Sequence, residues 1–278
     1  KVNLYLQVKD RLSSGYHQIT SIIQSITLAD EITISTANEL TLDCDDPRIN
    51  NRENLVLRAA SLLSKNFKPA GGARITLRKK IPMAAGLGGG SADAAATLIG
   101  LNKFWGLGLP YEQLAEFAVE LGADVSFCLS GGTALVTGFG EKIKPLPFID
   151  LGTFLIIKPT GGLFSGAVYQ EFDTLGKGQA KPSENFLRAS RVQDNVALVK
   201  EFVNDLEPAA VSLMPKINEI KKEAIEAGAL ACLVSGSGPS MFVIADTKEK
   251  RENITERLAG YGRIWLVECA REGITAVD

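Results

Sequence analysis

The chain opens with alternating apolar and polar positions, which predict a β-strand. Residues 2–8 (Val-Asn-Leu-Tyr-Leu-Gln-Val) follow this pattern, as expected where successive side chains point to opposite faces of a sheet. Further short apolar runs predict strands at residues 19–26, 31–35, 40–44, 74–78, 131–136, 141–145, 151–158, 230–235, 240–245 and 263–268. The strands at 131–136 and 141–145 lie on either side of Gly138-Phe139-Gly140, a spacing typical of a hairpin.

Other stretches carry apolar residues at helical spacing. They predict helices at residues 53–66, 91–104, 110–121, 124–129, 194–204, 215–227 and 248–259. Pro110 suits a first helical turn, while Gly122 and Gly228 suit the positions just after a last turn. Residues 173–185 are polar and rich in Gly, Lys and Pro, which predicts an exposed loop.

The pattern of elements changes near residue 150. The final β-loop-β-α-β order predicts a smaller α+β domain there. A length of 278 residues agrees with two domains, since a domain takes roughly 150 residues. We therefore expect domains at residues 1–150 and 151–278.

Composition and charge exclude several functions. The chain is 45% hydrophobic and 22% charged, which is typical of a globular protein. A net charge of −2 argues against a nucleic-acid partner, because binding a phosphate backbone requires a basic face. No run approaches the ~18 apolar residues of a membrane-spanning helix. We expect a cytoplasmic location, or the plastid stroma if an upstream transit peptide is missing from the sequence.

Cysteine and histidine counts narrow the chemistry further. The four cysteines form no Cys-x-x-Cys pair, which indicates free thiols in a reducing compartment. His17 is the single histidine, so a histidine-rich zinc site is excluded and a Ser-His-Asp triad would depend on that one residue. A general base is therefore expected to be a carboxylate or a lysine.

A glycine-rich loop is the strongest chemical signal in the chain. Its residues run from the end of a basic strand into an alanine-rich helix: Pro82, Met83, Ala84, Ala85, Gly86, Leu87, Gly88, Gly89, Gly90 and Ser91. Glycines let backbone N–H groups approach a ligand, and the first turn of a helix adds unpaired N–H donors with partial positive charge. The pattern predicts a polyphosphate site, although a flexible loop with close helix packing is the structural alternative.

Two better-known phosphate loops do not fit this segment. A Walker A loop requires a lysine before the Ser/Thr, and no lysine precedes Ser91. A dinucleotide fingerprint begun at Gly86 would need glycine at position 91.

A second loop of small residues lies between two predicted strands far downstream, at Ser235-Gly236-Ser237-Gly238-Pro239-Ser240. Its N–H and O–H groups could bind a phosphoryl group, or the loop could be a plain hairpin connection.

These segments together resemble the three ordered motifs of the GHMP kinases. The motifs are Lys1-Val2-Asn3-Leu4, Pro82-x-x-x-Gly86-Leu87-Gly88-Gly89-Gly90-Ser91 and Ser235-Gly236-Ser237-Gly238-Pro239-Ser240. Three further elements resemble one branch of the family: Gly15-Tyr16-His17, Leu121-Gly122-Ala123-Asp124-Val125 and Gly138-Phe139-Gly140-Glu141. The resemblance extends from residue 1 to about residue 245.

The resemblance implies a fold and a reaction. It implies an α+β, two-domain GHMP kinase fold with an N-terminal mixed α/β domain, a smaller ferredoxin-like C-terminal domain and an active site between them. The branch implies an ATP-dependent transferase that phosphorylates the 2-hydroxyl of a methylerythritol carrying a cytidine diphosphate group, in isoprenoid (terpenoid) precursor synthesis. Another GHMP small-molecule kinase, of homoserine or mevalonate type, and a catalytically inactive GHMP-fold sensor are the alternatives.

The resemblance also implies catalytic roles for Asp124 and Lys1. Asp124 corresponds to the general base and Lys1 to the lysine beside it. Neighbouring Val125 and Phe127 would partly desolvate the carboxylate, and an ammonium group would keep it ionised. Without the resemblance, Asp124 would be interpreted as a helix N-cap.

Binding roles are implied in the same way. The nucleotide would contact Pro82, Ala84, Ala85, Gly86, Leu87, Gly88, Gly89, Gly90 and Ser91, with Lys79 and Asn54 near it. The substrate would contact Asn3, Tyr16, His17, Tyr169, Ser237 and Gly238, with Tyr16 and Tyr169 stacked on the cytosine and His17 hydrogen-bonded to it. The alternatives are a surface or internally satisfied histidine at His17 and a solvated strand-end charge at Lys79.

The implied cofactors are ATP and Mg²⁺. A motif serine and a separate acidic residue often share the metal in this family, and Ser91 supplies the serine. Asp93 is near in sequence but two residues along a helix, so it faces a different side, and the metal ligands stay unassigned. The expected partner is the small-molecule substrate, and the expected assembly is a monomer or weak homodimer.

Overall fold

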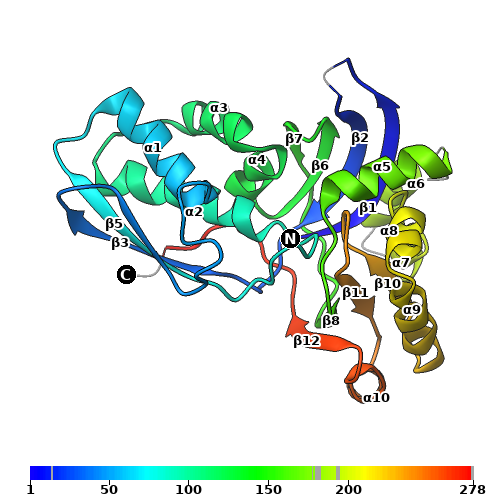
Figure 1. Cartoon of the computed structure of the whole chain (residues 1–278). Coiled ribbons are helices and arrows are strands. Elements are labelled where there is room, and N and C mark those ends of the chain that lie inside the picture. The colour runs from blue at the N-terminus through cyan, green and yellow to red at the C-terminus, as the bar shows by residue number, and fades with distance from the viewer. Residues whose placement is uncertain (14, 177, 179–182, 192–194, 277–278) are drawn as a thin grey trace. The chain divides into compact units, whose positions relative to one another are not determined.

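The computed structural model describes residues 1–13, 15–176, 178, 183–191 and 195–276, and Figure 1 shows its elements. The chain forms two compact units. The first unit comprises Lys1–Thr27, Met83–Leu87 and Gly132–Arg271. The second unit comprises Leu28–Pro82, Gly88–Gly131 and Glu272–Asp278.

A five-stranded sheet of the first unit contains the start of the chain. Its order is β7-β6-β2-β1-β9, and its strands are β1 (Val2–Arg11), β2 (His17–Gln24), β6 (Thr133–Gly138), β7 (Lys142–Pro145) and β9 (Val203–Asn204). In this sheet β1 and β9 pair in parallel, and the other neighbouring strands pair antiparallel. The predicted hairpin is confirmed as β6–β7, where Gly138 adopts φ +75° and the Glu141 carboxylate accepts the Phe139 N–H at 2.7 Å.

A second sheet of the first unit is four-stranded and antiparallel. Its order is β10-β11-β8-β12, with β8 (Phe154–Pro159), β10 (Ala231–Val234), β11 (Met241–Ile244) and β12 (Gly262–Val267). The helices of this unit are α5 (Ser165–Leu175), α6 (Glu184–Arg191), α7 (Asn195–Val199), α8 (Glu207–Leu213), α9 (Lys216–Glu226) and α10 (Lys248–Leu258). Val168, Ile217 and Ile254 from α5, α9 and α10 share one buried core with Ile157 and Val243 of the sheet.

The second unit packs helices with a small sheet of order β3-β5-β4. Its elements are β3 (Glu31–Ala37), β4 (Thr41–Cys44), β5 (Gly72–Arg78), α1 (Leu55–Phe67), α2 (Gly89–Phe104), α3 (Tyr111–Leu121) and α4 (Ala123–Ser130). A Cβ on Gly100 would lie 2.7 Å from Ile34 Cδ1, so α2 packs close against β3. Ala94 and Ala95 are fully buried, which explains why this helix is rich in alanine.

The predicted α+β class is confirmed, and most predicted elements are present within a few residues. The predicted helix at 194–204 is wrong in part, because α7 ends at Val199 and β9 follows, while residue 194 lies outside the described residues. Helices α5, α6 and α8 were not predicted. In α5 only Val168 and Phe172 are buried, so its apolar pattern is too short to stand out.

The exposed loop predicted at 173–185 is wrong at both ends. Helix α5 continues to Leu175 and α6 begins at Glu184, while residues 177 and 179–182 lie outside the described residues. The domain boundary at residue 150 stays a prediction. Across the described residues, no helix is long and apolar enough to cross a membrane.

Candidate active site

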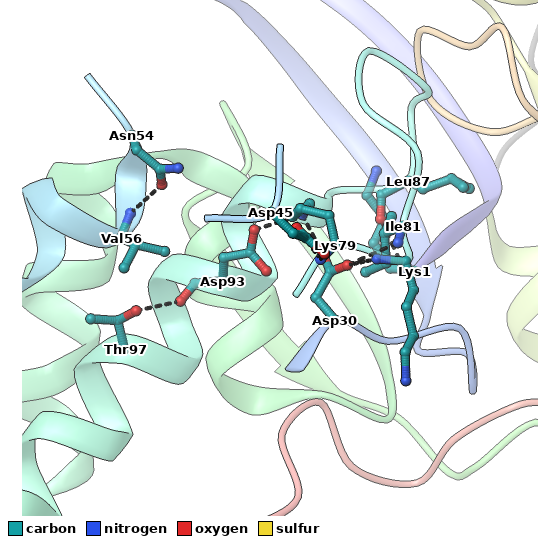
Figure 2. Close-up of polar contacts among 11 residues, drawn as sticks. Lys1, Asp30, Asp45, Asn54, Val56, Lys79, Ile81, Leu87, Asp93 and Thr97 are labelled. Carbon is teal, nitrogen blue, oxygen red and sulfur yellow. Dashed lines mark hydrogen bonds and ion pairs between the residues drawn. The ribbon is translucent and has the colours of Figure 1, made fainter. Parts of the chain in front are cut away.

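The start of β1 joins the first and third motifs in the first unit. Asn3 is 4% exposed, and its Oδ1 accepts a hydrogen bond from Lys1 Nζ at 2.8 Å. The Asn3 side-chain amide donates to Ser21 Oγ at 3.0 Å, and its backbone N–H donates to Ser235 Oγ at 3.3 Å. The backbone nitrogen of Lys1 donates to Leu87 O at 3.1 Å, as Figure 2 shows. Lys1 and Asn3 are therefore held close to the glycine-rich loop.

The first half of the glycine-rich loop lies on the third motif. Ser235 Oγ donates to Gly86 O at 3.1 Å, and the Ser240 N–H donates to Ala85 O at 3.2 Å. Gly86 has φ +74°, and a Cβ there would lie 2.1 Å from Ser235 O. Glycine is needed at this position both for the backbone conformation and for the close approach.

The third motif is the turn between β10 and β11, as predicted. Asn204 is buried, and its side-chain amide donates to Val234 O at 2.8 Å and Gly236 O at 2.7 Å. Ser237 Oγ and Ser165 Oγ are 2.8 Å apart, and Gly238 adopts φ +73°. The turn is thus a hairpin connection held by buried polar groups, and the substrate roles of Ser237 and Gly238 stay predictions.

The second half of the glycine-rich loop opens helix α2 in the second unit. Gly88 is the N-cap residue with φ +70°, and no side chain caps the helix. The first intrahelical bond runs from the Ala92 N–H to Gly88 O at 2.9 Å. The N–H groups of Gly89, Gly90 and Ser91 therefore belong to the unpaired first turn, a type of site that suits an anion. Their contact with a nucleotide stays a prediction. Gly90 is exposed and Ser91 half-buried, so a ligand can reach this turn.

Lys79 lies between the carboxylates of Asp30 and Asp93, as Figure 2 shows. Its Nζ is 2.5 Å from Asp30 Oδ2 and 2.6 Å from Asp93 Oδ2, and all three side chains are 9% exposed or less. Asp30 Oδ1 also accepts the backbone N–H groups of Lys80 at 2.5 Å and Ile81 at 2.8 Å. The interpretation of Lys79 as a solvated strand-end charge is wrong, while its contact with a nucleotide stays a prediction.

This cluster, Asp30–Lys79–Asp93, lies against the first turn of α2. A Cβ on Gly89 would lie 2.9 Å from Ile81 Cγ2 and 3.3 Å from Lys79 Nζ. Burial raises the pKa of Asp93 to about 7, the Asp30 charge adds to this rise, and the Lys79 charge opposes it. Burial would lower the pKa of Lys79, but the two carboxylates outweigh it and the pKa is raised.

The positions of Ser91 and Asp93 in the structure do not assign the metal ligands. Asp93 is directed into the cluster with Lys79, and Ser91 is half-buried. The expectation that their side chains face different sides stays a prediction. Among the residues that the structure describes, no group of three or more His, Cys, Asp or Glu side chains could hold a metal ion.

Asn54 caps helix α1 with its side-chain oxygen. Its Oδ1 accepts the Val56 N–H at 2.9 Å (Figure 2). Its Nδ2 donates to Ile49 O, before the helix, at 2.9 Å. The structure thus gives Asn54 a local role in starting α1, and its contact with a nucleotide stays a prediction.

Asp124 lies in the first turn of α4, in the second unit. The N-cap residue of this helix is Gly122, so the interpretation of Asp124 as an N-cap is wrong. Val125 and Phe127 are buried, and Asp124 itself is half-buried, which gives the carboxylate the partly desolvated setting that the sequence predicted. The catalytic roles of Asp124 and Lys1 stay predictions.

The predicted cytosine-binding residues belong to the first unit. His17 Nε2 lies 2.7 Å from Asp173 Oδ1, and its ring stacks on Tyr169 with centroids 5.2 Å apart and planes at 19°. Tyr16 is 64% exposed and packs against Phe139 at 5.7 Å. The surface interpretation of His17 is therefore wrong, because the ring is buried and its Nε2 is paired with Asp173. The binding roles of all three residues stay predictions.

Asp30, Asp173 and Ser235 are among the residues of these clusters that had no predicted role. Ser235 had a signal, because it begins the third motif. Asp30 and Asp173 had none, because their partners Lys79 and His17 are 49 and 156 positions away.

Comparison with known proteins adds two kinds of relative. The family model of the GHMP kinases N terminal domain matches residues 54–132, and that of the GHMP kinases C terminal matches residues 186–264. A protein of Moorella thermoacetica is 42% identical over 264 residues, covering 93% of this chain and 92% of the relative. One of Caldanaerobacter subterraneus subsp. tengcongensis is 40% identical over 251 residues, covering 90% and 87%. Both are named 4-diphosphocytidyl-2-C-methyl-D-erythritol kinase.

Solved structures similar to this chain include a kinase with the same substrate in its name as these relatives. A crystal structure of 4-(cytidine 5'-diphospho)-2C-methyl-D-erythritol kinase superimposes with a TM-score of 0.81 at 33% identity, covering 97% of this chain and 96% of that one. The mevalonate kinase of L. major has a TM-score of 0.70 at 17% identity, with coverage of 97% and 95%, which indicates a shared fold alone.

Proposed function

The chain belongs to the GHMP kinase family, and we propose that it phosphorylates 4-diphosphocytidyl-2-C-methyl-D-erythritol at the 2-hydroxyl. The products are the 2-phosphate and ADP, in the non-mevalonate route to isoprenoid precursors. The observation that carries this proposal is the 40–42% identity to kinases of that name over nine-tenths of the chain or more. The geometry supports it, because residues from all three motifs meet in one hydrogen-bonded network in the first unit.

In this proposal the glycine-rich loop binds the phosphates of ATP. The N–H groups of Gly89, Gly90 and Ser91 at the start of α2 face no side-chain cap and suit anionic oxygens. Mg²⁺, bound with the nucleotide, supplies charge neutralisation on the phosphate oxygens. Most of the rate of such a transfer comes from positioning and charge stabilisation, which rigidly held backbone donors can provide.

Asp124 is the proposed general base. It would take the proton from the attacking hydroxyl, a contribution typically worth about 10²–10⁴ in rate. Lys1, whose ammonium is hydrogen-bonded to the Asn3 side chain, would stabilise negative charge at the reaction centre.

Tyr16, His17 and Tyr169 are the proposed cytosine site. The exposed ring of Tyr16 suits stacking on a base, which is worth about 1–3 kcal/mol. We also propose a cytoplasmic location, which the bacterial source of the relatives supports.

The test is an ADP-release assay with Mg-ATP that compares 4-diphosphocytidyl-2-C-methyl-D-erythritol with homoserine, mevalonate and galactose. Turnover of the first compound alone, with the new phosphate located on the 2-oxygen by ³¹P NMR, is the expected result. Turnover of another alcohol would support kinase activity but contradict the proposed cytosine-binding site. Nucleotide binding with no turnover of any alcohol would favour a catalytically inactive sensor.

A further inference from the structure

We propose that Asp173 is a positioning residue that fixes which nitrogen of His17 carries the proton, and thereby makes the site select cytosine over uracil. The inference rests on the proposed function for its ligand, and it adds a residue that lies outside the sequence motifs. It starts from the contact between His17 on β2 and Asp173 on α5, 156 positions apart.

The chemistry of this contact determines the tautomer. His17 Nε2 lies 2.7 Å from Asp173 Oδ1. An ionised carboxylate only accepts hydrogen bonds, so Nε2 must be the donor and must carry the proton. In a neutral imidazole the other nitrogen, Nδ1, then has a free lone pair and acts as an acceptor.

The ring is also held in one orientation. His17 is only 9% exposed, its face stacks on Tyr169, and its edge meets Phe172 with centroids 6.1 Å apart at 89°. Tyr169, Phe172 and Asp173 all come from α5, so one helix supplies the stacking ring, the edge contact and the acceptor. Within the described part of the chain, Nδ1 makes no hydrogen bond. The acceptor nitrogen is therefore fixed in place and available to a ligand.

The guanidinium of Arg11 also lies near Asp173. Arg11 Nη1 lies 3.7 Å from Asp173 Oδ2, on the oxygen that does not face His17. This pair is well exposed, with side-chain exposures of 63% and 38%, so we expect it to contribute little to stability. Arg11 therefore offers a matched control, because its loss leaves the carboxylate beside His17 in place.

The two pyrimidines differ at the position that such an acceptor reads. Cytosine carries an exocyclic amino group, which donates a hydrogen bond, where uracil carries a carbonyl oxygen, which accepts one. An Nδ1 acceptor pairs with the amino group and repels the carbonyl oxygen. With the proton moved to Nδ1, the same ring would favour uracil.

The first test is direct, because His17 is the single histidine of the chain. A long-range ¹H–¹⁵N NMR spectrum of untagged protein, at a pH where the imidazole is neutral, then shows one imidazole and reports its tautomer. We expect the Nε2–H form in the wild type and in Arg11→Gln, and a mixture in Asp173→Asn, because an amide can accept from or donate to Nε2. A mixture already in the wild type, or a pure Nε2–H form in Asp173→Asn, would overturn the inference.

The second test measures recognition by competition of CMP and UMP against the substrate. The wild type and Arg11→Gln should bind CMP more tightly than UMP. In Asp173→Asn this preference should fall about tenfold, which corresponds to about 1.4 kcal/mol, the free energy of one hydrogen bond. Asp173→Asn should raise KM for the cytidine substrate more than it lowers kcat. Asp173→Glu should restore part of the preference for CMP. If Asp173→Asn weakened the binding of CMP and of UMP equally, Asp173 would have a structural role and no role in selecting the base. A wild type with no preference for CMP would instead contradict the cytidine substrate, while the NMR result would still decide the tautomer.

Discussion

The two halves of the glycine-rich loop rest on buried polar clusters of opposite kinds. Gly86, in the first unit, contacts a network of largely neutral groups, in which Ser235 joins Asn3 to the loop. Gly89, in the second unit, lies against the charged Asp30–Lys79–Asp93 cluster. Both clusters are nearly excluded from solvent, so their difference lies in charge rather than in burial.

That difference predicts how each half responds to change. A neutral hydrogen bond contributes about 1 kcal/mol, and its loss leaves a modest desolvation penalty. A buried charge that loses its partner is far more costly, and its neutralisation by a proton depends on pH. The neutral network should therefore tolerate single deletions, whereas the charged cluster should not.

The largest expected effect is that of Lys79→Met. The change leaves the Asp30 and Asp93 carboxylates buried without their cation, and we expect a loss of about 3–5 kcal/mol in the free energy of unfolding. Urea denaturation measures it. Lys80→Met is the matched control, because Lys80 pairs with Glu31 at an exposed site and should change stability by about 1 kcal/mol or less. Equal losses in the two variants would show that the cluster does not behave as a buried one.

The next effect, with an upper limit comparable to that of Lys79→Met, should appear as a pH dependence removed by Asp93→Asn. The folded-state pKa of Asp93, about 7, lies above its ordinary value of 3.8. Between these values the folded state retains a proton that the unfolded state has released, so the contribution of Asp93 to stability is complete below about 4 and is lost as the pH rises to about 7. The slope for one proton is at most about 1.4 kcal/mol per pH unit.

The measurement is the difference in the free energy of unfolding between wild type and Asp93→Asn at several pH values. The wild type should lose stability relative to the variant as the pH rises through this window, and the difference should become constant above it. Parallel curves across the whole range would refute the raised pKa of Asp93.

The smallest effect is expected for Ser235→Ala in the neutral network. The change removes the acceptor of the Asn3 N–H and the donor to Gly86 O, so we expect a loss of about 1–2 kcal/mol in unfolding free energy, together with a higher KM for ATP. Ser212→Ala serves as the control, because Ser212 bonds Glu171 at an exposed position of the same unit. A loss in Ser235→Ala as large as that in Lys79→Met would remove the distinction between the two clusters.

Local signals were enough to predict much of this architecture. The glycine run followed by alanines predicted the start of α2, because both the unpaired first turn and the close packing are encoded by adjacent residues. The β6–β7 hairpin and the turn at Ser235–Ser240 were predicted for the same reason. The three motifs could be located individually, but the hydrogen bonds that connect them could not.

What could not be predicted depends on tertiary contacts. The basic strand end around Lys79 has the appearance of a solvated charge until Asp30 and Asp93 enclose it. His17 likewise has no visible partner in its own part of the sequence, since Asp173 lies on a helix whose two buried apolar positions were too few to predict it. Pairs of this kind become visible only once the chain has folded.

The most direct test of the catalytic account is the kcat of Asp124→Asn with Mg-ATP and 4-diphosphocytidyl-2-C-methyl-D-erythritol, measured beside the dissociation constants of both ligands. The substitution keeps the shape of the side chain and removes its basicity. We predict a fall in kcat of about 10²–10⁴ with binding of both ligands nearly unchanged. Wild-type turnover in a variant that binds both ligands normally would contradict the assignment of Asp124 as the general base.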